Sequence, residues 1–261
     1  MSPAAGFDPT LLSRIEDAGL NASAPPQQRW IDGWLLRYCP GKARRARCVQ
    51  AVATGRLSNA ERLALCEAVL DEAGLPLFVR ITPFSQPPGL NDWLLDQGLH
   101  ALDDTQVMVT TTLPDANTPP PIGTQLVPTN AEHYADAVGD LRGSTATQRA
   151  AHAHRMAHSP IPYRGWLLQR IDDHQVLACA QTAAEADMVG VYDVFTAPAA
   201  RGQRLAGWLC ATLLAQAASA GARVAYLQVD AANTAARQVY RRLGFANAYG
   251  YHYVARDPRA T

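Results

Sequence analysis

Apolar residues recur with two different spacings in the second half of the chain, and together they predict a mixed α/β fold. Apolar runs at 165–171, 175–182 and 188–196 indicate three successive strands, the first two joined as a hairpin across Asp172-Asp173-His174. Residues 203–219 have the spacing of a long helix that ends before Gly221. Further elements are expected at 124–127 (strand), 131–157 (helical), 225–229 (strand), 234–243 (helix) and 249–256 (strand).

The first half of the chain shows a similar alternation. Strands are expected at 34–38, 47–52, 77–81 and 106–112, and a short helix at 90–97. Ser58 and Glu61 have the spacing of a capping box and predict a helix that buries Leu63, Cys66 and Leu70. A mixed sheet with helices on both faces follows from this order of elements.

A proline-rich stretch separates the two halves. Residues 113–123 contain four prolines among polar residues, which neither a helix nor a central strand tolerates. We therefore expect a first domain at 1–113, an extended linker at 114–123 and a second domain at 124–261.

Composition narrows the possible functions. The chain has 261 residues, 48% of them hydrophobic, and 23 basic residues balance 23 acidic ones. The zero net charge argues against a nucleic-acid partner, and no apolar run is long enough to predict a membrane span. No secretory signal precedes the first domain, and five scattered cysteines indicate reduced thiols, so a cytoplasmic protein is expected. We expect no metal site, and a monomer or a homodimer.

The most informative segment joins the strand at 188–196 to the long helix. After Pro198 the chain passes through a short loop with Arg201, Gly202 and Arg204. The first-turn amides of a helix lack internal partners and lie at the positive end of the helix dipole, so such a turn can bind a diphosphate. An ordinary strand-to-helix turn with surface arginines is the simpler alternative. The spaced glycines of a dinucleotide fold and the Gly-Lys-Ser/Thr of a Walker loop are both absent.

About thirty residues later a second group of residues follows. Asn233 stands where a strand gives way to a helix, Tyr240 follows two helical turns later, and Gly244-Phe245 closes the helix. Separately these residues suit a helix N-cap, a core tyrosine and a C-cap. Their combination with the preceding loop is more specific.

Together the two segments resemble the GCN5-related N-acetyltransferase (GNAT) superfamily, most clearly over residues 189–256. The resemblance implies a GNAT fold with two splayed central strands and acetyl-CoA as acyl donor. It implies that the pantetheine arm pairs with the backbone of the first splayed strand, that the loop amides hold the diphosphate, and that Asn233 lies beside the pantetheine. The implied cofactor-binding residues are Val194, Phe195, Thr196, Arg201, Gly202, Gln203, Arg204, Leu205, Ala206, Gly207, Asn233 and Tyr240.

By the same resemblance, Tyr240 is the catalytic acid that protonates the departing thiolate. One position departs from the pattern, because the middle glycine of the family's loop is Arg204 here. If that position requires a positive φ, cofactor binding is impaired. The general base stays open: the positions that carry Glu in other members are Gln228 and Gly190, which leaves Glu185, Asp187, Tyr192 and Asp193 as candidates.

The first half looks like a degenerate second copy of the same fold. The strand at 77–81, the helix at 90–97 and Gly98-Leu99 echo the strand at 225–229, the helix at 234–243 and Gly244-Phe245. The loop position near 52–58 lacks the glycine pattern, however, and Pro87-Pro88 replaces the Asn-centred turn. The main hypothesis is thus a tandem N-acetyltransferase that moves an acetyl group from acetyl-CoA to a primary amine of a small molecule or peptide. The alternative is a non-catalytic module that binds acyl-CoA.

Overall fold

A computed structural model describes residues 6–39, 43–115 and 118–257. The first half contains α1 (Pro9–Ala22), β1 (Gln28–Ile31), β2 (Trp34–Arg37), η1 (Arg44–Ala46), β3 (Val49–Ala51), α2 (Asn59–Glu72), β4 (Val79–Ile81), α3 (Leu90–Asp96) and β5 (His100–Thr110). The second half contains β6 (Thr124–Thr129), α4 (Ala131–Arg142), α5 (Ala146–Ala157), β7 (Tyr163–Arg170), β8 (Val176–Glu185), β9 (Met188–Thr196), η2 (Pro198–Ala200), α6 (Leu205–Ser219), β10 (Val224–Asp230), α7 (Thr234–Arg242) and β11 (Ala246–Ala255).

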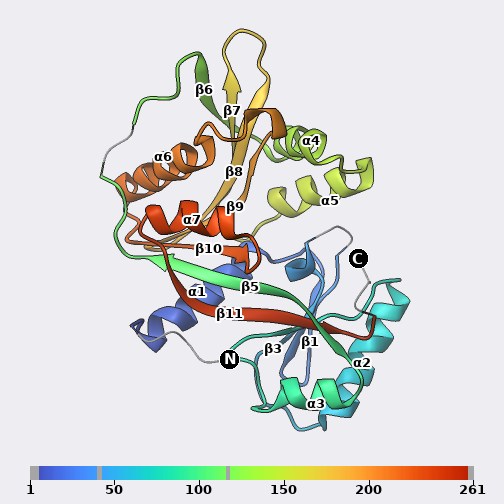
Figure 1. Ribbon diagram of the computed structural model, residues 1–261. Helices are drawn as coiled ribbons and strands as arrows, with labels where there is room; N and C mark the ends of the chain where they lie inside the picture. Colours follow the sequence, from blue (N-terminus) through green and yellow to red (C-terminus); the bar gives the residue numbers. More distant parts are fainter. Residues whose placement is uncertain (1–5, 40–42, 116–117, 258–261) are drawn as a thin grey trace.

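All strands of the described residues join one sheet, in the order β1-β2-β3-β4-β11-β5-β10-β9-β8-β7-β6. The two halves exchange strands at its centre: β5 of the first half lies between β10 and β11, and β11 of the second half lies between β4 and β5 (Figure 1). Both β5 pairings and the β11–β4 pairing are antiparallel. The boundaries expected at 113 and 124 remain predictions, but the sheet itself does not divide at the linker.

Alternation of side chains places helices on both faces of the second half. Leu168 and Ala178 pack against α6, whereas their neighbours Leu167 and Cys179 pack against α4 and α5. This period of two is expected of a strand covered on both faces. Figure 1 shows α6 on one side of β8 and the α4–α5 pair on the other.

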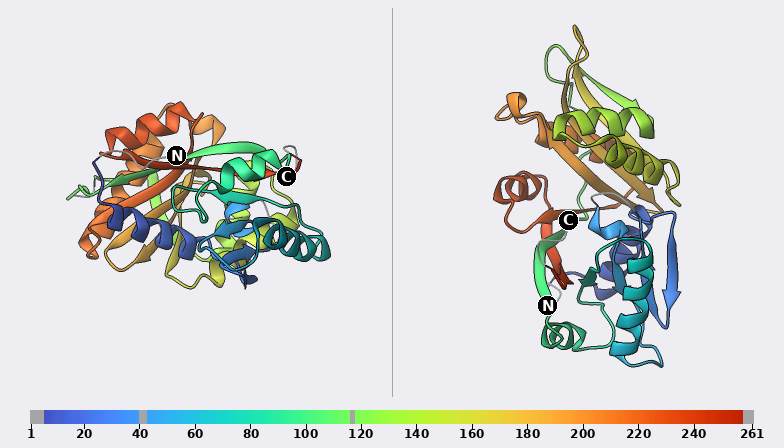
Figure 2. Two further views of the ribbon diagram at one scale, coloured as in Figure 1. Left: turned by 90° about the horizontal axis from the view of Figure 1, so that it is seen from below. Right: turned by 90° about the vertical axis from the view of Figure 1, so that its right-hand side faces the viewer.

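Helix α1 connects the two halves although it opens the described chain. Its apolar face (Leu12, Ile15, Ala18 and Ala22) packs in one core with Met188, Tyr192 and Tyr226 of the second half. Arg14 pairs with Asp187, and Asn21 donates a hydrogen bond to Glu185 at 2.9 Å. The right-hand view of Figure 2 shows most of the second half above the first half, with β5 and β11 running alongside the first half.

The predicted elements agree with the structure in type, with shifted ends. The strand at 188–196 has the expected bounds, and the Ser58–Glu61 capping box starts α2. Helix α1, with its Asp8 cap and Pro9, and strand β1 were not predicted. The five cysteines are free and buried, as expected. Within the described residues no helix is long and apolar enough to cross a membrane.

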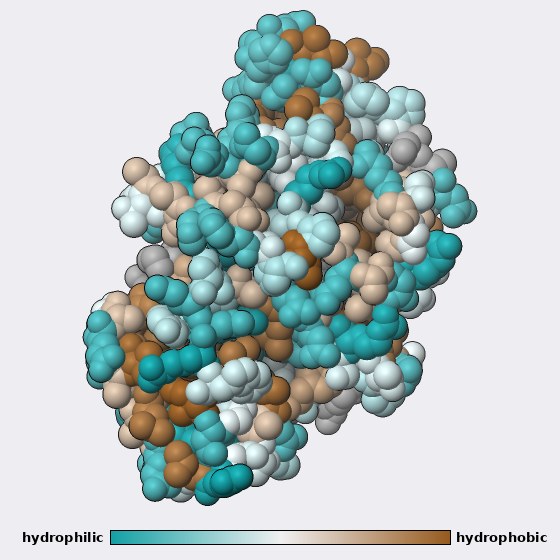
Figure 3. Space-filling model, turned by 180° about the vertical axis from the view of Figure 1, so that it is seen from behind, coloured by the Kyte–Doolittle hydropathy of each residue, from teal (hydrophilic) through white to brown (hydrophobic). Residues whose placement is uncertain are grey.

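The surface of the chain is mostly polar. Figure 3 shows hydrophilic residues over much of one face, with hydrophobic ones gathered at its lower left, over the first half of the chain. Trp30, Leu65 and Leu95 are among the exposed large apolar residues, and all three belong to that half.

Candidate acetyl-donor and acceptor sites

The parallel strands β9 and β10 separate part-way along their length. They pair from Met188 and Val224 as far as Val191 and Leu227, and the remainder of β9 has no partner on that side among the described residues. Cys179 of β8 faces Phe195 and Gln181 faces Tyr192, so Asp193 and Val194 together oppose a single residue. This is a β-bulge, and Asp193 has a φ of 52°. The predicted splay is confirmed, and the backbone of Val194, Phe195 and Thr196 borders the opening.

The turn after Pro198 leads from this opening into α6. Arg201, Gly202, Gln203 and Arg204 are exposed, while Leu205 is buried beneath them. Arg204 is the N-cap residue and its side chain makes no capping hydrogen bond. The amides of Leu205, Ala206 and Gly207 occupy the first helical turn, where they have no intrahelical partner. A helix start with open amides is able to bind an anion.

Arg204 itself adopts the left-handed conformation, with φ 59° and ψ 17°. The loop thus reaches the backbone geometry that a glycine would give, at a cost of about 1 kcal/mol for an L-residue. Gly202 also has a positive φ, 80°, and an added Cβ there would meet nothing within 4 Å. The unfavourable case considered for Arg204, a positive φ, is therefore the one observed, and the loop adopts it with a strained arginine in place of glycine.

Asn233 and Tyr240 lie on either end of α7. The Asn233 side chain accepts a 3.0 Å hydrogen bond from the Ala236 amide, so it is the N-cap of that helix. Tyr240 packs edge-to-face on Phe245. Both belong to a core that also contains Val191 and Leu227, and Val194 packs against this core. Burial, with a smaller contribution from Cys210, raises the pKa of Tyr240 above its usual value. The phenol is therefore protonated at neutral pH.

A cavity of about 340 Å³ lies beside the bulge. Its walls come from α4, α5 and β9 of the second half and, in the first half, from the end of α1, Cys39 and residues 43–46. Residues of both halves therefore line this cavity. Tyr249, Tyr251 and Tyr253, which share one strand face by alternation, do not line it and are buried in the core between the halves.

Asp193 and His152 face each other in this cavity. The Asp193 carboxylate pairs with Arg142 at 2.6 Å, accepts from the Tyr134 hydroxyl at 3.3 Å and lies 4.0 Å from His152 Nε2. The Gln181 amide donates to His152 Nε2 at 2.8 Å and accepts from the Tyr163 hydroxyl at 3.0 Å. Burial, and next Arg155, lowers the pKa of His152 to about 4. His152 is therefore a neutral imidazole, with Asp193 the adjacent carboxylate.

The other candidates for a base have structural partners. Glu185 and Asp187 bind Asn21 and Arg14 across the junction, and the Tyr192 hydroxyl donates to Tyr226 at 3.0 Å. Sequence reasoning missed His152, because nothing near it in the sequence marks it as functional. Regular alternation along the strand would put Asp193 on the face opposite to Val194, but the bulge interrupts that alternation.

The sequence matches a described family over most of its length. Residues 12–254 match the family "Probable histone acetyltransferase Rv0428c C-terminal". The chain belongs to this family. The match spans both halves of the chain. No curated protein matches the chain significantly.

Solved structures show that the fold of this acetyltransferase-family chain is a GNAT fold. A GCN5-related N-acetyltransferase from Kribbella flavida is 18% identical, with 93% of this chain and 94% of that chain covered at a TM-score of 0.65. A tandem GNAT protein from the clavulanic acid biosynthesis pathway is 14% identical, with 97% and 96% covered at 0.64. A functionally unknown conserved protein from Staphylococcus epidermidis is 10% identical, with 88% and 94% covered at 0.63.

The first half of this family member repeats the arrangement of the second but closes its opening. Strands β3 and β4 are parallel, as β9 and β10 are. At the end of β3, however, the Ala51 carbonyl oxygen accepts a hydrogen bond from the Gln86 amide at 2.8 Å, so this carbonyl is paired within the chain. The Asp32 carboxylate accepts from the amides of Arg56 and Leu57 at 3.0 and 2.7 Å. A carboxylate of the chain thus occupies the position where the second half offers open amides.

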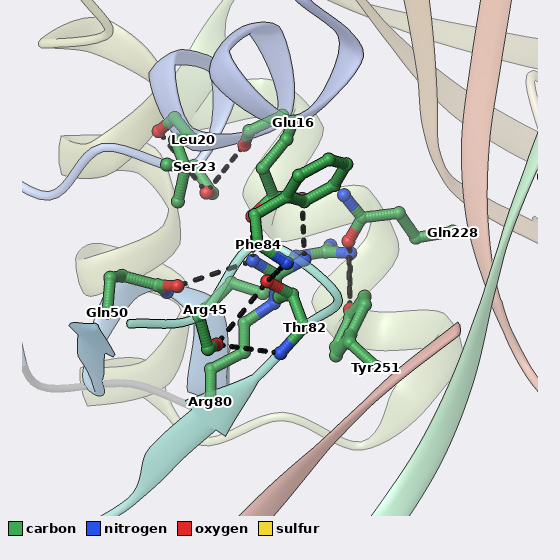
Figure 4. Close-up of polar contacts among 12 residues, drawn as sticks. Glu16, Leu20, Ser23, Arg45, Gln50, Arg80, Thr82, Phe84, Gln228 and Tyr251 are labelled. Carbon is green, nitrogen blue, oxygen red and sulfur yellow. Dashed lines mark hydrogen bonds and ion pairs between the residues drawn. The ribbon is translucent and has the colours of Figure 1, made fainter. Parts of the chain in front are cut away.

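Polar side chains fill the space behind this closed opening (Figure 4). Arg80 pairs with Glu16, stacks 3.8 Å over the Tyr251 ring and approaches Gln50 at 3.3 Å. The Arg80 charge and its hydrogen bond outweigh burial and lower the pKa of Glu16. Both members of this buried ion pair therefore have polar partners within the chain, Gln50 for Arg80 and the Tyr249 hydroxyl for Glu16.

Charge alone would predict a solvated hairpin for the basic cluster at residues 42–47, but its described part does not form one. Its described part forms η1, and Arg45 extends inward to the Gln228 side-chain oxygen, which also accepts from the Tyr251 hydroxyl at 2.9 Å. Lys42 lies outside the described residues. The glutamine at the position expected for a catalytic Glu therefore fixes Arg45 at the edge of the cavity (Figure 4).

Proposed function

We propose that the chain is an acetyl-CoA-dependent N-acetyltransferase that acetylates a primary amine by direct attack in a ternary complex. The observation that supports this most directly is the unpaired edge of β9 beside the open first turn of α6. A backbone edge can pair with the amide-containing pantetheine arm, and the turn can hold the diphosphate. Tyr192 and Asp193, which precede that edge on β9, line the cavity.

The residues on the two sides of the opening then have complementary roles. The amine nitrogen attacks the thioester carbonyl carbon, a C–N bond forms, and the C–S bond breaks. Asp193 and His152 receive the amine proton, directly or through water, while Tyr240 gives its proton to the departing thiolate. Most of the acceleration comes from holding the two substrates together.

Two measurements test this proposal. Calorimetry with acetyl-CoA should give one site per chain, because only the second half has an open turn. A free-thiol assay over a panel of amines should then show turnover with at least one of them. Binding without thiol release from any amine would favour the alternative, a non-catalytic acyl-CoA-binding module, and no binding would exclude both.

A matched pair of variants locates the chemistry. Asp193→Asn should lower turnover at least tenfold while acetyl-CoA binding is retained, since the carboxylate lies in the acceptor cavity rather than at the α6 turn. Asp187→Asn is the control, because Asp187 is an exposed carboxylate on the preceding turn that pairs only with Arg14 among the described residues. Equal effects of the two changes would contradict the assignment of Asp193.

A further inference from the structure

The acceptor cavity has an excess of positive charge. Four arginines line it, Arg45 from the first half and Arg142, Arg149 and Arg155 from the second, and Asp193 is the single carboxylate in its lining. His152 adds no charge, because its pKa lies well below neutral pH. Arginine keeps its proton in proteins, so this excess persists at every physiological pH.

Two of the four arginines already have acidic partners. Arg142 pairs with Asp193 at 2.6 Å. Arg149 pairs with Asp140 at 2.6 Å and also donates to the backbone oxygens of Ser144 and Asp136, at 3.0 and 3.3 Å. Arg149 therefore ties α4 to α5 rather than serving a ligand.

The other two arginines contact neutral groups. Arg45 binds the Gln228 side-chain oxygen and lies 5.5 Å from the centre of the Tyr192 ring, and Arg155 lies 5.9 Å from the centre of the Tyr163 ring. Within the part of the chain that the structure describes, neither has a carboxylate partner at salt-bridge distance. Both are half-buried, so water screens their charge only in part.

These two guanidinium groups come from opposite halves of the chain and lie near two neighbouring tyrosine rings. Tyr163 and Tyr192 stack with their ring centres 5.8 Å apart. Arg155 lies near the Tyr163 ring and Arg45 near the Tyr192 ring. Asp193 follows Tyr192 directly, at the bulge that borders the opening. The cavity thus combines two uncompensated cations with a carboxylate–imidazole pair beside the donor site.

We propose that the acceptor is a small amine that also carries an anionic group, a carboxylate or a phosphate. Arg45 and Arg155 hold the anionic group, and the amino group points toward Asp193 and His152. Both arginines can form two parallel hydrogen bonds to either kind of anion. This assignment rests on the proposed acetyl transfer and specifies its substrate class.

The charge pattern disfavours polycationic acceptors. A lysine-rich tail, of the kind the family's description suggests, would bring further positive charges toward Arg45 and Arg155. Like charges in a half-buried site cost binding energy that an exposed surface would not impose. The 340 Å³ cavity is also at the small end of the range for ligand pockets, as a single small molecule requires.

Matched pairs of amines test the proposal. The free-thiol assay compares α-amino acids with their carboxamides, phosphoethanolamine with ethanolamine, and both sets with a lysine-rich peptide. We expect kcat/KM to be at least tenfold higher for the anionic member of one pair, and which pair responds tells whether a carboxylate or a phosphate is recognised. Equal rates within both pairs, or a preference for the peptide, would overturn the proposal.

Variants connect that preference to the two arginines. Arg155→Gln should reduce kcat/KM for the anionic acceptor by about 10- to 100-fold through KM, with little change for its neutral counterpart. Arg45→Lys should retain part of the preference for the anionic acceptor, because lysine keeps the positive charge but cannot form the two parallel hydrogen bonds of a guanidinium group. Arg170→Gln is the control, since Arg170 pairs with Asp173 on the surface. An equal loss for both members of a pair would refute the anion-binding role.

The two proposals fail in distinguishable ways. If the chain does not bind acetyl-CoA, the acetyl-transfer function fails, whatever the acceptor. If acetyl-CoA binds and thiol is released with neutral or cationic amines alone, the function stands and the anionic acceptor is excluded.

Discussion

Replacing Arg204 by glycine should stabilise the protein, although it removes the side chain nearest the start of α6. Arg204 holds φ 59° and ψ 17°. A left-handed conformation costs an L-residue about 1–2 kcal/mol, and glycine avoids that cost. Glycine also gives the unfolded chain more freedom, which returns roughly 0.5–1 kcal/mol. The net gain is therefore about 0.5–1 kcal/mol.

Urea denaturation measures this gain directly. The midpoint should rise at an unchanged slope, and the melting temperature should rise by about 2–3 °C for a chain of this size. Gly202→Ala in the same loop is the matched opposite change. Its φ is 80° and its added Cβ meets nothing within 4 Å, so it should destabilise by about 1 kcal/mol through conformation alone.

Acetyl-CoA affinity should move in the other direction. Arg204→Gly removes a positive charge beside the proposed diphosphate site, so binding should weaken a few-fold and depend less on salt. Arg204→Asn separates the two effects, because asparagine tolerates the left-handed region but carries no charge. The reasoning fails if Arg204→Gly lowers stability, or if both variants bind acetyl-CoA as the parent does at low salt.

Three further changes test the site and the fold. Tyr240→Phe should lower thiol release at least tenfold at unchanged acetyl-CoA affinity, because the buried phenol is the proposed proton donor; unchanged turnover would remove that role. Folded His152 has a pKa of about 4 against 6.5 in the unfolded chain, so the unfolded state takes up the proton first as pH falls. The free energy of unfolding should therefore decline from about pH 7 toward pH 4, by about 2 kcal/mol at pH 5. The His152→Asn variant should lack this part of the pH dependence in urea unfolding. An unaltered pH dependence would contradict the burial of a neutral imidazole. A fragment of residues 118–261 should not fold alone, because β10 and β11 lose β5 between them; co-expression with residues 1–115 should restore a native circular dichroism spectrum, and a stable monomeric fragment would show that the exchange is dispensable.

Local signals predicted the donor side of the molecule well. Strand β9, the turn after Pro198 and the N-cap at Asn233 depend on residues close in sequence, and the structure has each at the expected place. Helix α1 had a comparable signal, an Asp8 cap, Pro9 at the first turn and apolar residues at helical spacing, and it could have been found.

The acceptor side depends on residues far apart in sequence and was not predictable in this way. Arg45, His152 and Asp193 come from three separate elements, and only the fold brings them to one cavity. Periodicity also misjudged Asp193, because a bulge shifts side chains by one position and leaves no composition signal. From sequence alone, an arginine-rich segment is predicted to be exposed to water. Its neutral partners, here Gln228 and Tyr192, are distant in sequence and become known only from the structure.

Strand exchange accounts for the retention of a half that has lost its own coenzyme opening. Val107, Met108 and Val109 of β5 are almost wholly buried between β10 and β11, so the second half cannot complete its sheet without the first. Once β5 is fixed there, the chain that precedes it is held against the acceptor cavity, where it supplies Arg45 and the end of α1. The first half thus contributes to the proposed acceptor cavity by lining it, rather than through a coenzyme site of its own. A change in that lining could alter acceptor choice while the donor site, formed wholly by the second half, stays the same.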